Sequence, residues 1–331
     1  MILAGDIGGT NTRLALFASE GKTLRHVAET TYGSRDHNSL EEIVEKFLAK
    51  YSESVERGCL GIAGPVQDGR VKASNLPWLV DAKELSRRAG IAQITLINDL
   101  EATAHGIASL QPEEFVVLSP GEADAKGNAA VIAAGTGLGE AVLYWDGSRH
   151  RPFACEGGHG DFAPRSDLEL ELFRYLRTEF GRVSYERVLS GPGLHNIYRF
   201  LRDTGRGTEP PWLTEQMQQG DPSATISRAA LAGTSSLCVE AIELFVSIYG
   251  AEAGNLALKV MARAGMYLGG GIAPKILGKL KSGTFMESFW TKGRMRVLLQ
   301  TMPVRVILND KTALMGAARF AMLEDSSELS G

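Results

Sequence analysis

Residues 2–17 of this 331-residue chain read ILAGDIGGTNTRLALF. The segments Ile2–Gly5 and Thr12–Phe17 are short and mostly apolar, which is typical of strands. Between them lies Gly8-Gly9-Thr10-Asn11, a sequence suited to a tight turn because glycine and asparagine tolerate positive φ angles. The chain is therefore predicted to begin with two strands joined by a polar turn.

A second pattern of strand, glycine-rich turn and strand is predicted at residues 130–145. Ala130–Ala134 and Glu140–Trp145 flank the turn Gly135-Thr136-Gly137-Leu138-Gly139. A polyphosphate needs backbone N–H groups within hydrogen-bond range, and side chains in the turn would obstruct them. One such turn is more often only structural. Its repetition suggests an internal duplication, in which the turns face each other across a cleft and grip one triphosphate from both sides.

Strands and helices alternate along the rest of the chain, which predicts an α/β fold with a mixed sheet. A capping-box pattern at Ser39 and Glu42 precedes a helix that continues to Tyr51. A helical segment over residues 236–264 is expected to be interrupted at Gly250 or Gly254, and residues 204–222 are expected to form a long surface excursion. Further strands are predicted at 59–63, 94–97 and 304–308, and further helices at 81–90, 100–107 and 311–322.

The composition favours a folded protein with a small-molecule partner. Apolar residues make up 44% of the chain and charged residues 22%, and the formal net charge is -4. That charge gives no general attraction for nucleic acid or anionic lipid. The three cysteines are widely spaced, and neither an export signal nor a membrane-length apolar run is present. A cytoplasmic location without nucleic-acid or membrane partners is expected.

Several polar residues follow predicted strands. Asp6 ends the first strand and could hold Mg²⁺ through water, since hard cations prefer oxygen ligands and keep part of their hydration. Asn98 and Asp99 lie where strand 94–97 meets helix 100–107, at the sheet edge where open α/β proteins bind ligands. The alternative role for either residue is a helix N-cap, which Asn and Asp commonly form.

The loop Glu156-Gly157-Gly158-His159-Gly160 brings a carboxylate and an imidazole together. It is too rich in glycine to serve packing, which indicates hydrogen bonding to a polar ligand. Glu186 and Asn75 are less distinctive, because a solvated helix face and a turn would explain them equally well. Gly269-Gly270-Gly271 suits either the close approach of a nucleotide or a simple turn between a strand and a helix.

Two common nucleotide-binding motifs do not fit. Residues 135–139 are not GxGxxG, and a strand pattern follows them where a dinucleotide-binding protein would begin a helix. Residues 64–71 have P-loop spacing, but Arg70 and Val71 occupy the positions that require Lys and Ser or Thr. Binding of NAD is therefore disfavoured, and the P-loop match is accidental.

Taken in order, several segments resemble the motif series of the bacterial glucokinase family, which belongs to the actin-like ATPase and hexokinase superfamily. Each is weak alone, but the ordered set is highly specific. The resemblance implies two actin-like (ribonuclease H-like) α/β domains flanking a nucleotide and sugar cleft. Residues 1–109, joined by the C-terminal helix 309–325, would form the smaller domain, and residues 110–308 the larger. The segments are Leu3–Asn11, Gly61–Pro65, Ile97–Asp99, Ala134–Gly139, Glu156–His159, Gly191–Gly193 and Leu268–Ile272.

The same resemblance implies an activity and a role for each candidate residue. The activity would be ATP-dependent phosphorylation of glucose to glucose 6-phosphate, with Asp99 as the general base, Mg²⁺ as the metal and a homodimer as the assembly. Sugar hydroxyls would be bound by Asn75, Asn98, Asp99, Glu156, His159 and Glu186. ATP would be contacted by Gly5, Asp6, Ile7, Gly8, Gly9, Thr10, Asn11, Gly135, Thr136, Gly137 and Gly270.

One departure separates the chain from the neighbouring repressor/open-reading-frame/kinase family. That family carries a cysteine-rich zinc loop after its ExGH element, whereas Gly160-Asp161-Phe162-Ala163 follows His159 here. His159 is thus a candidate sugar ligand, and a DNA-binding module is not expected because the first turn begins almost at Met1. The alternatives are a kinase of another hexose or amino sugar, a non-kinase actin-like ATPase, and a sugar sensor without catalysis.

Overall fold

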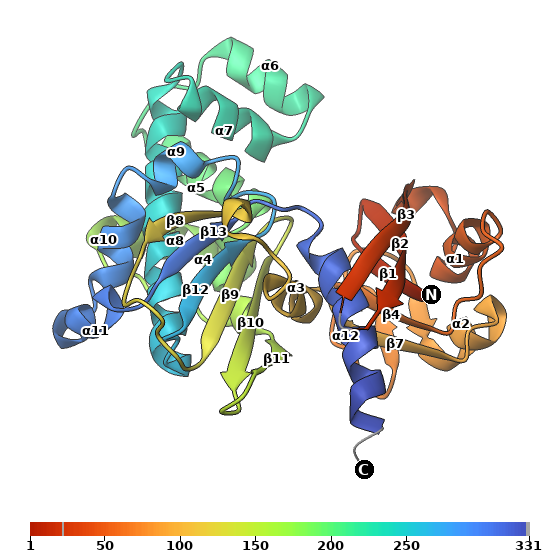
Figure 1. Ribbon diagram of the computed structural model, residues 1–331. Coiled ribbons are helices and arrows are strands. Elements are labelled where there is room, and N and C mark those ends of the chain that lie inside the picture. Colours follow the sequence, from red (N-terminus) through yellow and green to blue (C-terminus); the bar gives the residue numbers. More distant parts are fainter. Residues whose placement is uncertain (22, 329–331) are drawn as a thin grey trace. The chain divides into compact units, whose positions relative to one another are not determined.

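The computed structural model describes residues 1–21 and 23–328, with side chains described as far as Leu323 (Figure 1). The chain divides into two compact units. Unit 1 comprises Met1–Pro112, Pro152–Ala154 and the residues from Asn309 onward, and unit 2 comprises Glu113–Arg151 and Cys155–Leu308.

Unit 1 is built on a five-stranded sheet with the order β3-β2-β1-β4-β7. β1 (Ile2–Ile7) pairs antiparallel with β2 (Asn11–Glu20) and parallel with β4 (Arg57–Ile62), and β4 pairs parallel with β7 (Gln93–Asn98). β3 (Thr23–Gly33) pairs antiparallel with β2 at the edge of the sheet. The predicted hairpin at the start of the chain is confirmed.

Helices cover both faces of this sheet, α1 (Leu40–Leu48) and α2 (Ala82–Ala89) on one face, α3 (Asp99–Ile107) and α12 (Thr312–Glu328) on the other. Successive side chains of a strand point to opposite faces. Leu3 accordingly packs with α1 and α2, whereas Ala4 packs with α3 and α12. The same alternation places Asp6 on the face covered by α3 and α12.

Unit 2 contains a six-stranded sheet with the order β11-β10-β9-β12-β13-β8. β9 pairs antiparallel with β10 and parallel with β12, which pairs parallel with β13. The order from β11 to β13 therefore repeats the order from β3 to β7 in unit 1. The strands are β8 (Phe115–Ser119), β9 (Ala129–Ala134), β10 (Leu138–Trp145), β11 (His150–Cys155), β12 (Gly265–Gly269) and β13 (Val304–Ile307).

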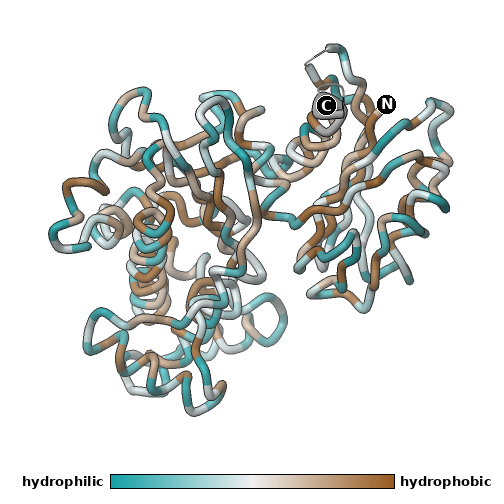
Figure 2. The backbone as a smooth tube through the Cα atoms, turned by 90° about the horizontal axis from the view of Figure 1, so that it is seen from below, coloured by the Kyte–Doolittle hydropathy of each residue, from teal (hydrophilic) through white to brown (hydrophobic). Residues whose placement is uncertain are grey.

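A large hydrophobic core joins this sheet to a layer of helices. Its centre is α8 (Ser236–Val260), where Phe245 and Tyr249 are fully buried. Figure 2 shows hydrophobic segments running through the interior of each unit. The other helices of four or more residues are α4 (Asp167–Phe180), α5 (Gly191–Asp203), α6 (Pro211–Gln219), α7 (Pro222–Leu231), α9 (Leu277–Leu280), α10 (Thr284–Trp290) and α11 (Arg296–Gln300).

Two expectations about unit 2 are wrong. α8 is continuous through Gly250 and Gly254, because these glycines let the backbone of α10 approach at Phe285 and Phe289, where a Cβ atom would not fit. The excursion at 204–222 contains α6. Pro211 is the first residue of this helix, a position where the N–H group that proline lacks is not needed.

In the described part of the chain, no single helix is long and apolar enough to span a membrane. Only α7 and α8 taken together pass that test by length and composition, and they meet at an angle of 102°.

Candidate functional site

The first glycine turn joins β1 to β2 and is held closed by its own backbone and by a serine. Gly8 N donates to Asn11 O at 2.9 Å. Ser34, which begins the short helix η1 (Ser34–Asp36), donates from its side chain to Gly8 O at 2.7 Å and from its backbone N–H to Thr10 O at 2.9 Å. Ser34 was not among the residues predicted from the sequence. No local motif marks it, because these hydrogen-bond partners precede the strand pair β2–β3 and Ser34 follows it.

Asn75 lies against this turn. It is an exposed residue in the loop between β5 (Arg70–Lys72) and β6 (Leu79–Asp81), and a Cβ atom at Gly9 would come within 2.6 Å of its Cβ atom. Two predicted ligand segments, one for ATP and one for sugar, are thus adjacent in unit 1. Gly5 and Ile7 are buried in β1, so only their backbone could contribute to a nucleotide site.

Asn98 is the N-cap of α3. Its Oδ1 atom accepts from Leu100 N at 2.9 Å and from Glu101 N at 3.4 Å, and its Nδ2 atom donates to Gly64 O at 3.3 Å. The capping role that the sequence left open therefore falls to Asn98. Asp99 is the first helical residue, half-buried, and its carboxylate accepts from Leu100 N at 3.0 Å.

Asp6 is the centre of an acidic cluster in unit 1. Burial, and then the charge of Asp99, raises the pKa of Asp6 to about 6, with a smaller contribution from Asp310 in the same direction and an opposing one from Arg13. Arg13 Nη2 donates to Asp310 Oδ2 at 2.8 Å, and Arg13 Nη1 donates to the backbone oxygen of Asp310 at 2.8 Å. Arg13 stands opposite Asp6 in the register of β1 and β2.

This cluster suits a hydrated divalent cation. Its donors are carboxylate oxygens, which Mg²⁺ prefers, and a cation would stabilise the ionised form of Asp6, which burial and then the charge of Asp99 disfavour. Among the residues with described side chains, no three His, Cys, Asp or Glu groups come together closely enough to bind a metal directly. The fit is therefore to an ion that keeps most of its water.

Sequence reasoning missed Arg13 and Asp310, although the chain carries a signal for the second. Asn98-Asp99 follows Ile97, and Asn309-Asp310 follows Leu308. Each Asn-Asp pair comes at or just after the end of the fifth strand in its sheet order, and Asn309 Oδ1 accepts from Lys311 N at 2.8 Å as Asn98 Oδ1 accepts from Leu100 N. A search for this repeat would have found Asp310 together with Asp99.

The second glycine turn, in unit 2, joins β9 to β10. Gly135 N donates to Gly137 O at 2.9 Å, and Gly135 O accepts from Gly191 N at 2.8 Å. Ala134 O, just before the turn, accepts from Ile272 N at 3.2 Å. Gly270 has a φ angle of +78°, which a side chain would strain. The structure thus brings the turn 135–137 together with the segments at 191 and 270–272.

Glu186 reaches the same turn. It lies in the short helix η4 (Tyr185–Arg187), and its Oε2 atom accepts from Leu138 N at 3.0 Å. The carboxylate predicted to bind sugar therefore also fixes the end of the turn predicted to bind phosphate.

Glu156 is the N-cap residue of the short helix η3 (Gly157–His159), and His159 is its last residue. Glu156 Oε2 lies 3.8 Å from His159 Nε2, and each side chain is 57% exposed. Arg182 holds the loop from the other side, because it donates to His159 O and pairs with Asp161 at 2.7 Å. These two side chains are accessible to a polar ligand from solvent.

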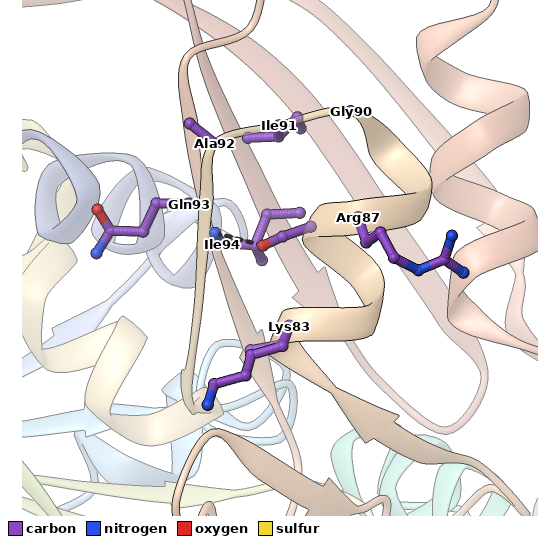
Figure 3. A pocket seen from close by; sticks show the side chains of 9 residues that line it. Lys83, Arg87, Gly90, Ile91, Ala92, Gln93 and Ile94 are labelled. Carbon is purple, nitrogen blue, oxygen red and sulfur yellow. Dashed lines mark hydrogen bonds between the residues drawn. The ribbon is translucent and has the colours of Figure 1, made fainter.

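A pocket of about 640 Å³ lies elsewhere in unit 1. It is lined by the end of α2 and the start of β7, with Lys83 and Arg87 on the helix and Gln93 on the strand (Figure 3). Ile94 N donates to Ser86 Oγ at 2.9 Å across it. Asn98 and Asp99 follow the opposite end of β7, so this cavity holds none of the predicted site residues.

Comparison with known proteins gives a consistent result along the whole chain. A family model described as Glucokinase matches residues 3–324. The glucokinase of Nostoc sp. is 42% identical over 96% of this chain and 98% of its own length. The crystal structure of a glucokinase from an Antarctic psychrotroph, 33% identical, matches with a TM-score of 0.84 over 97% of this chain and 98% of that one.

A glucokinase of the ROK family from Streptomyces griseus, solved with glucose and AMPPNP, is more distant. It is 22% identical and has a TM-score of 0.66 over 97% of this chain and 99% of its own, so it supports the actin-like fold alone. The predicted α/β fold is confirmed by these structures. On the family model and the relatives of similar length, the chain belongs to the bacterial glucokinase family.

Proposed function

We propose that this chain transfers the γ-phosphoryl group of ATP to glucose and releases glucose 6-phosphate, with Asp99 as the general base. One observation carries the assignment of the base. Asn98 already caps α3, so the Asp99 carboxylate is not needed for the cap and stands half-buried beside Asp6 at the end of a parallel strand. Ligands bind at that edge in open α/β sheets.

Phosphoryl transfer requires little covalent chemistry from the protein, which mainly positions the reactants and offsets charge. Asp99 would accept the proton of the attacking hydroxyl. The amides of Asn75 and Asn98 and the side chains of Glu156, His159 and Glu186 would hold the other sugar hydroxyls. The backbone of residues 5–11 would contact the triphosphate, and so would residues 135–137 and Gly270.

Magnesium bound with ATP would neutralise part of the triphosphate charge. Asp6 is the residue that would hold it, through water. The raised pKa of Asp6 supports this assignment, because burial first, and then the charge of Asp99, makes the ionised carboxylate costly, and a nearby cation would offset that cost.

The substrate is tested with a coupled assay over glucose, mannose, galactose, fructose and N-acetylmannosamine, with ATP as donor. Glucose should be strongly preferred, because each polar group left unpaired by a misplaced hydroxyl costs about 1–3 kcal/mol. Equal kcat/KM for several hexoses would contradict this substrate assignment, and activity on N-acetylmannosamine would favour an amino-sugar kinase. Rapid ATP hydrolysis without any sugar would favour a non-kinase ATPase.

A cytoplasmic location and a homodimeric assembly complete the proposal. Both rest on the family. Sedimentation equilibrium at micromolar concentration should give twice the mass of the chain, and a single-chain mass would contradict the dimer.

A further inference from the structure

The first residues of β10 support three of the predicted site segments in unit 2. Leu138 N donates to Glu186, and Leu138 lies at the end of the turn 135–137. A Cβ atom at Gly158 would overlap Leu138 O, and one at Gly157 would overlap the carboxylate oxygen Oε2 of Glu140. The loop that carries Glu156 and His159 therefore rests directly on the backbone of Leu138 and on the side chain of Glu140.

Glu140 is an unusual residue for this position. Its side chain is 1% exposed within a strand whose other buried side chains are apolar, and in the described part of the chain its Oε1 atom has no hydrogen-bond partner. A buried carboxyl group without full hydrogen bonding is costly, so its retention calls for a role that an apolar side chain would not fill.

A second buried carboxyl group faces Glu140 from α8. Glu252 is 0% exposed, its Oε2 atom accepts from Asn255 Nδ2 at 2.7 Å, and its Oε1 atom lies 3.6 Å from Lys259 Nζ. Burial first, and then the charge of Glu252, raises the pKa of Glu140 to about 7, whereas Lys259 lowers it.

The other titratable groups around this pair lie on α8, on β11, on η4 and at Lys292 and Glu156. Tyr249 lies on α8, and Cys155 on β11, with its Sγ atom donating to Glu140 O at 3.5 Å. Tyr185 on η4 accepts from Asn255 at 3.1 Å, and burial raises its pKa far above the ordinary value. Lys292 donates to Asn255. Burial is the main cause that lowers the pKa of Lys292 to about 8. Glu156 interacts electrostatically with Cys155. Glu140 is the carboxyl group of this cluster whose pKa burial, and then the charge of Glu252, raises to about 7.

We propose that Glu140 is a positioning residue for glucose binding, which supports the loop Glu156–His159 through Gly157 while it is protonated and displaces that loop when it ionises. The neutral carboxyl group of Glu140 is not repelled by Glu252. It can therefore stay in contact with Gly157. An ionised Glu140 is repelled by Glu252 and poorly solvated, and because its Oε2 atom already lies against Gly157, a shift of the carboxylate away from Glu252 displaces the loop. The inference rests on the proposed function of Glu156 and His159.

The test compares the KM for glucose and for ATP between pH 5.5 and 8.5 in the intact protein and in Glu140→Gln, which keeps the shape and cannot ionise. In the intact protein the KM for glucose should rise several-fold as pH passes about 7, with the KM for ATP unchanged. Glu140→Gln should keep the low glucose KM across the range. Glu140→Ala, which removes the support, should raise the glucose KM about tenfold at every pH.

Two further variants sharpen the test. Glu252→Gln removes the repulsion, so the rise in glucose KM should move to a lower pH. Glu171→Gln changes an exposed carboxylate of unit 2 that pairs with Arg206, and should leave the profile unchanged. If Glu140→Gln shows the same pH profile as the intact protein, or if folded Glu140→Ala keeps the original glucose KM, the inference is overturned.

Failure of this inference and failure of the proposed function give different results. Glu156→Gln and His159→Ala test the loop directly. If both leave the glucose KM unchanged, the proposed sugar site is wrong. If they raise it and the Glu140 variants do not, the site is right and only the role of Glu140 is wrong.

Discussion

The two units share a strand order, but the segment that leads from the fifth strand of that order into a helix differs between them. In unit 1, β7 leads through Asn98 and Asp99 into α3, and in unit 2, β13 leads through Asn309 and Asp310 into α12. Asp99 is half-buried at the first position of its helix, whereas the Asp310 side chain is 72% exposed and pairs with Arg13. One local sequence thus provides a proposed base in one copy and an electrostatic neighbour of Asp6 in the other.

Both helices, α3 and α12, belong to unit 1, and they pack closely against each other at glycine residues. A Cβ atom at Gly106 of α3 would overlap Thr312 O, and one at Gly316 of α12 would overlap Ala102 O. The second copy therefore supports the helix that begins at Asp99. The comparison teaches that the helix following the second Asn-Asp pair packs against the helix that begins at the proposed base.

Replacing each of the two aspartates by asparagine gives the largest expected difference in kcat. Asp99→Asn should lower kcat by about 10² to 10⁴, since a positioned general base contributes that much. The melting temperature should change little, because Asn98 provides the cap. Asp310→Asn should lower kcat by about threefold or less, since a surface ion pair contributes about 0–1 kcal/mol. Steady-state kinetics on folded variants measures both, and near-normal turnover in Asp99→Asn would remove the assigned base.

The helix crossing predicts a stability effect. Gly316→Ala should lower the free energy of unfolding by about 1–3 kcal/mol, although alanine is the better helix former, because the added methyl group has no space beside Ala102 O. Urea unfolding of this variant is compared with Gly278→Ala, where a Cβ atom meets nothing within 4 Å. An unchanged midpoint for Gly316→Ala would show that α12 does not constrain α3.

The acidic cluster predicts a dependence of stability on pH. The pKa of Asp6 in the folded chain, about 6, lies above its ordinary value of 3.8, so the folded protein retains a proton that the unfolded chain has lost. The free energy of unfolding should therefore fall as pH rises from about 4 to 6. Asp6→Asn should remove this part of the fall. If the variant keeps the full slope in pH-dependent unfolding, other groups cause it.

The capping pair gives the smallest expected difference. Asn98→Ala should cost about 1 kcal/mol of stability through loss of the N-cap of α3. Asn309→Ala should cost less, because Asn309 lies ahead of the helix and accepts from Lys311 N in an exposed turn. Equal losses measured by thermal unfolding would mean that both copies cap alike.

Features that depend on neighbours in the sequence were predictable. The first hairpin, the glycine turns and the capping of α1 by Ser39, whose hydroxyl accepts from Glu42 N, all follow from local turn and cap chemistry. The ordered motifs then identified the family, because their combination is far more specific than any one of them.

Features that depend on distant partners were not predictable in the same way. Glycine in α8 suggested a break, because its propensity is low, but the backbone of α10 at Phe285 decides the outcome. Glu186 carried no local mark of its contact with Leu138, which lies 48 positions earlier in the chain. Arg13 was likewise hidden, since its partner Asp310 is 297 positions away.

The position of α12 has a consequence for how the chain is made. Leu314 and Ala317 complete the same core as Ile2 and Ala4, so this core can form only after all of unit 2 has been synthesised. Unit 2 has all of its strands and its core helices before that point. A nascent chain on the ribosome should therefore fold its second unit first, while the part of the β1 and β4 face that α12 covers stays exposed. Contacts of such long sequence separation slow folding, and chaperones would have most opportunity to bind during that interval.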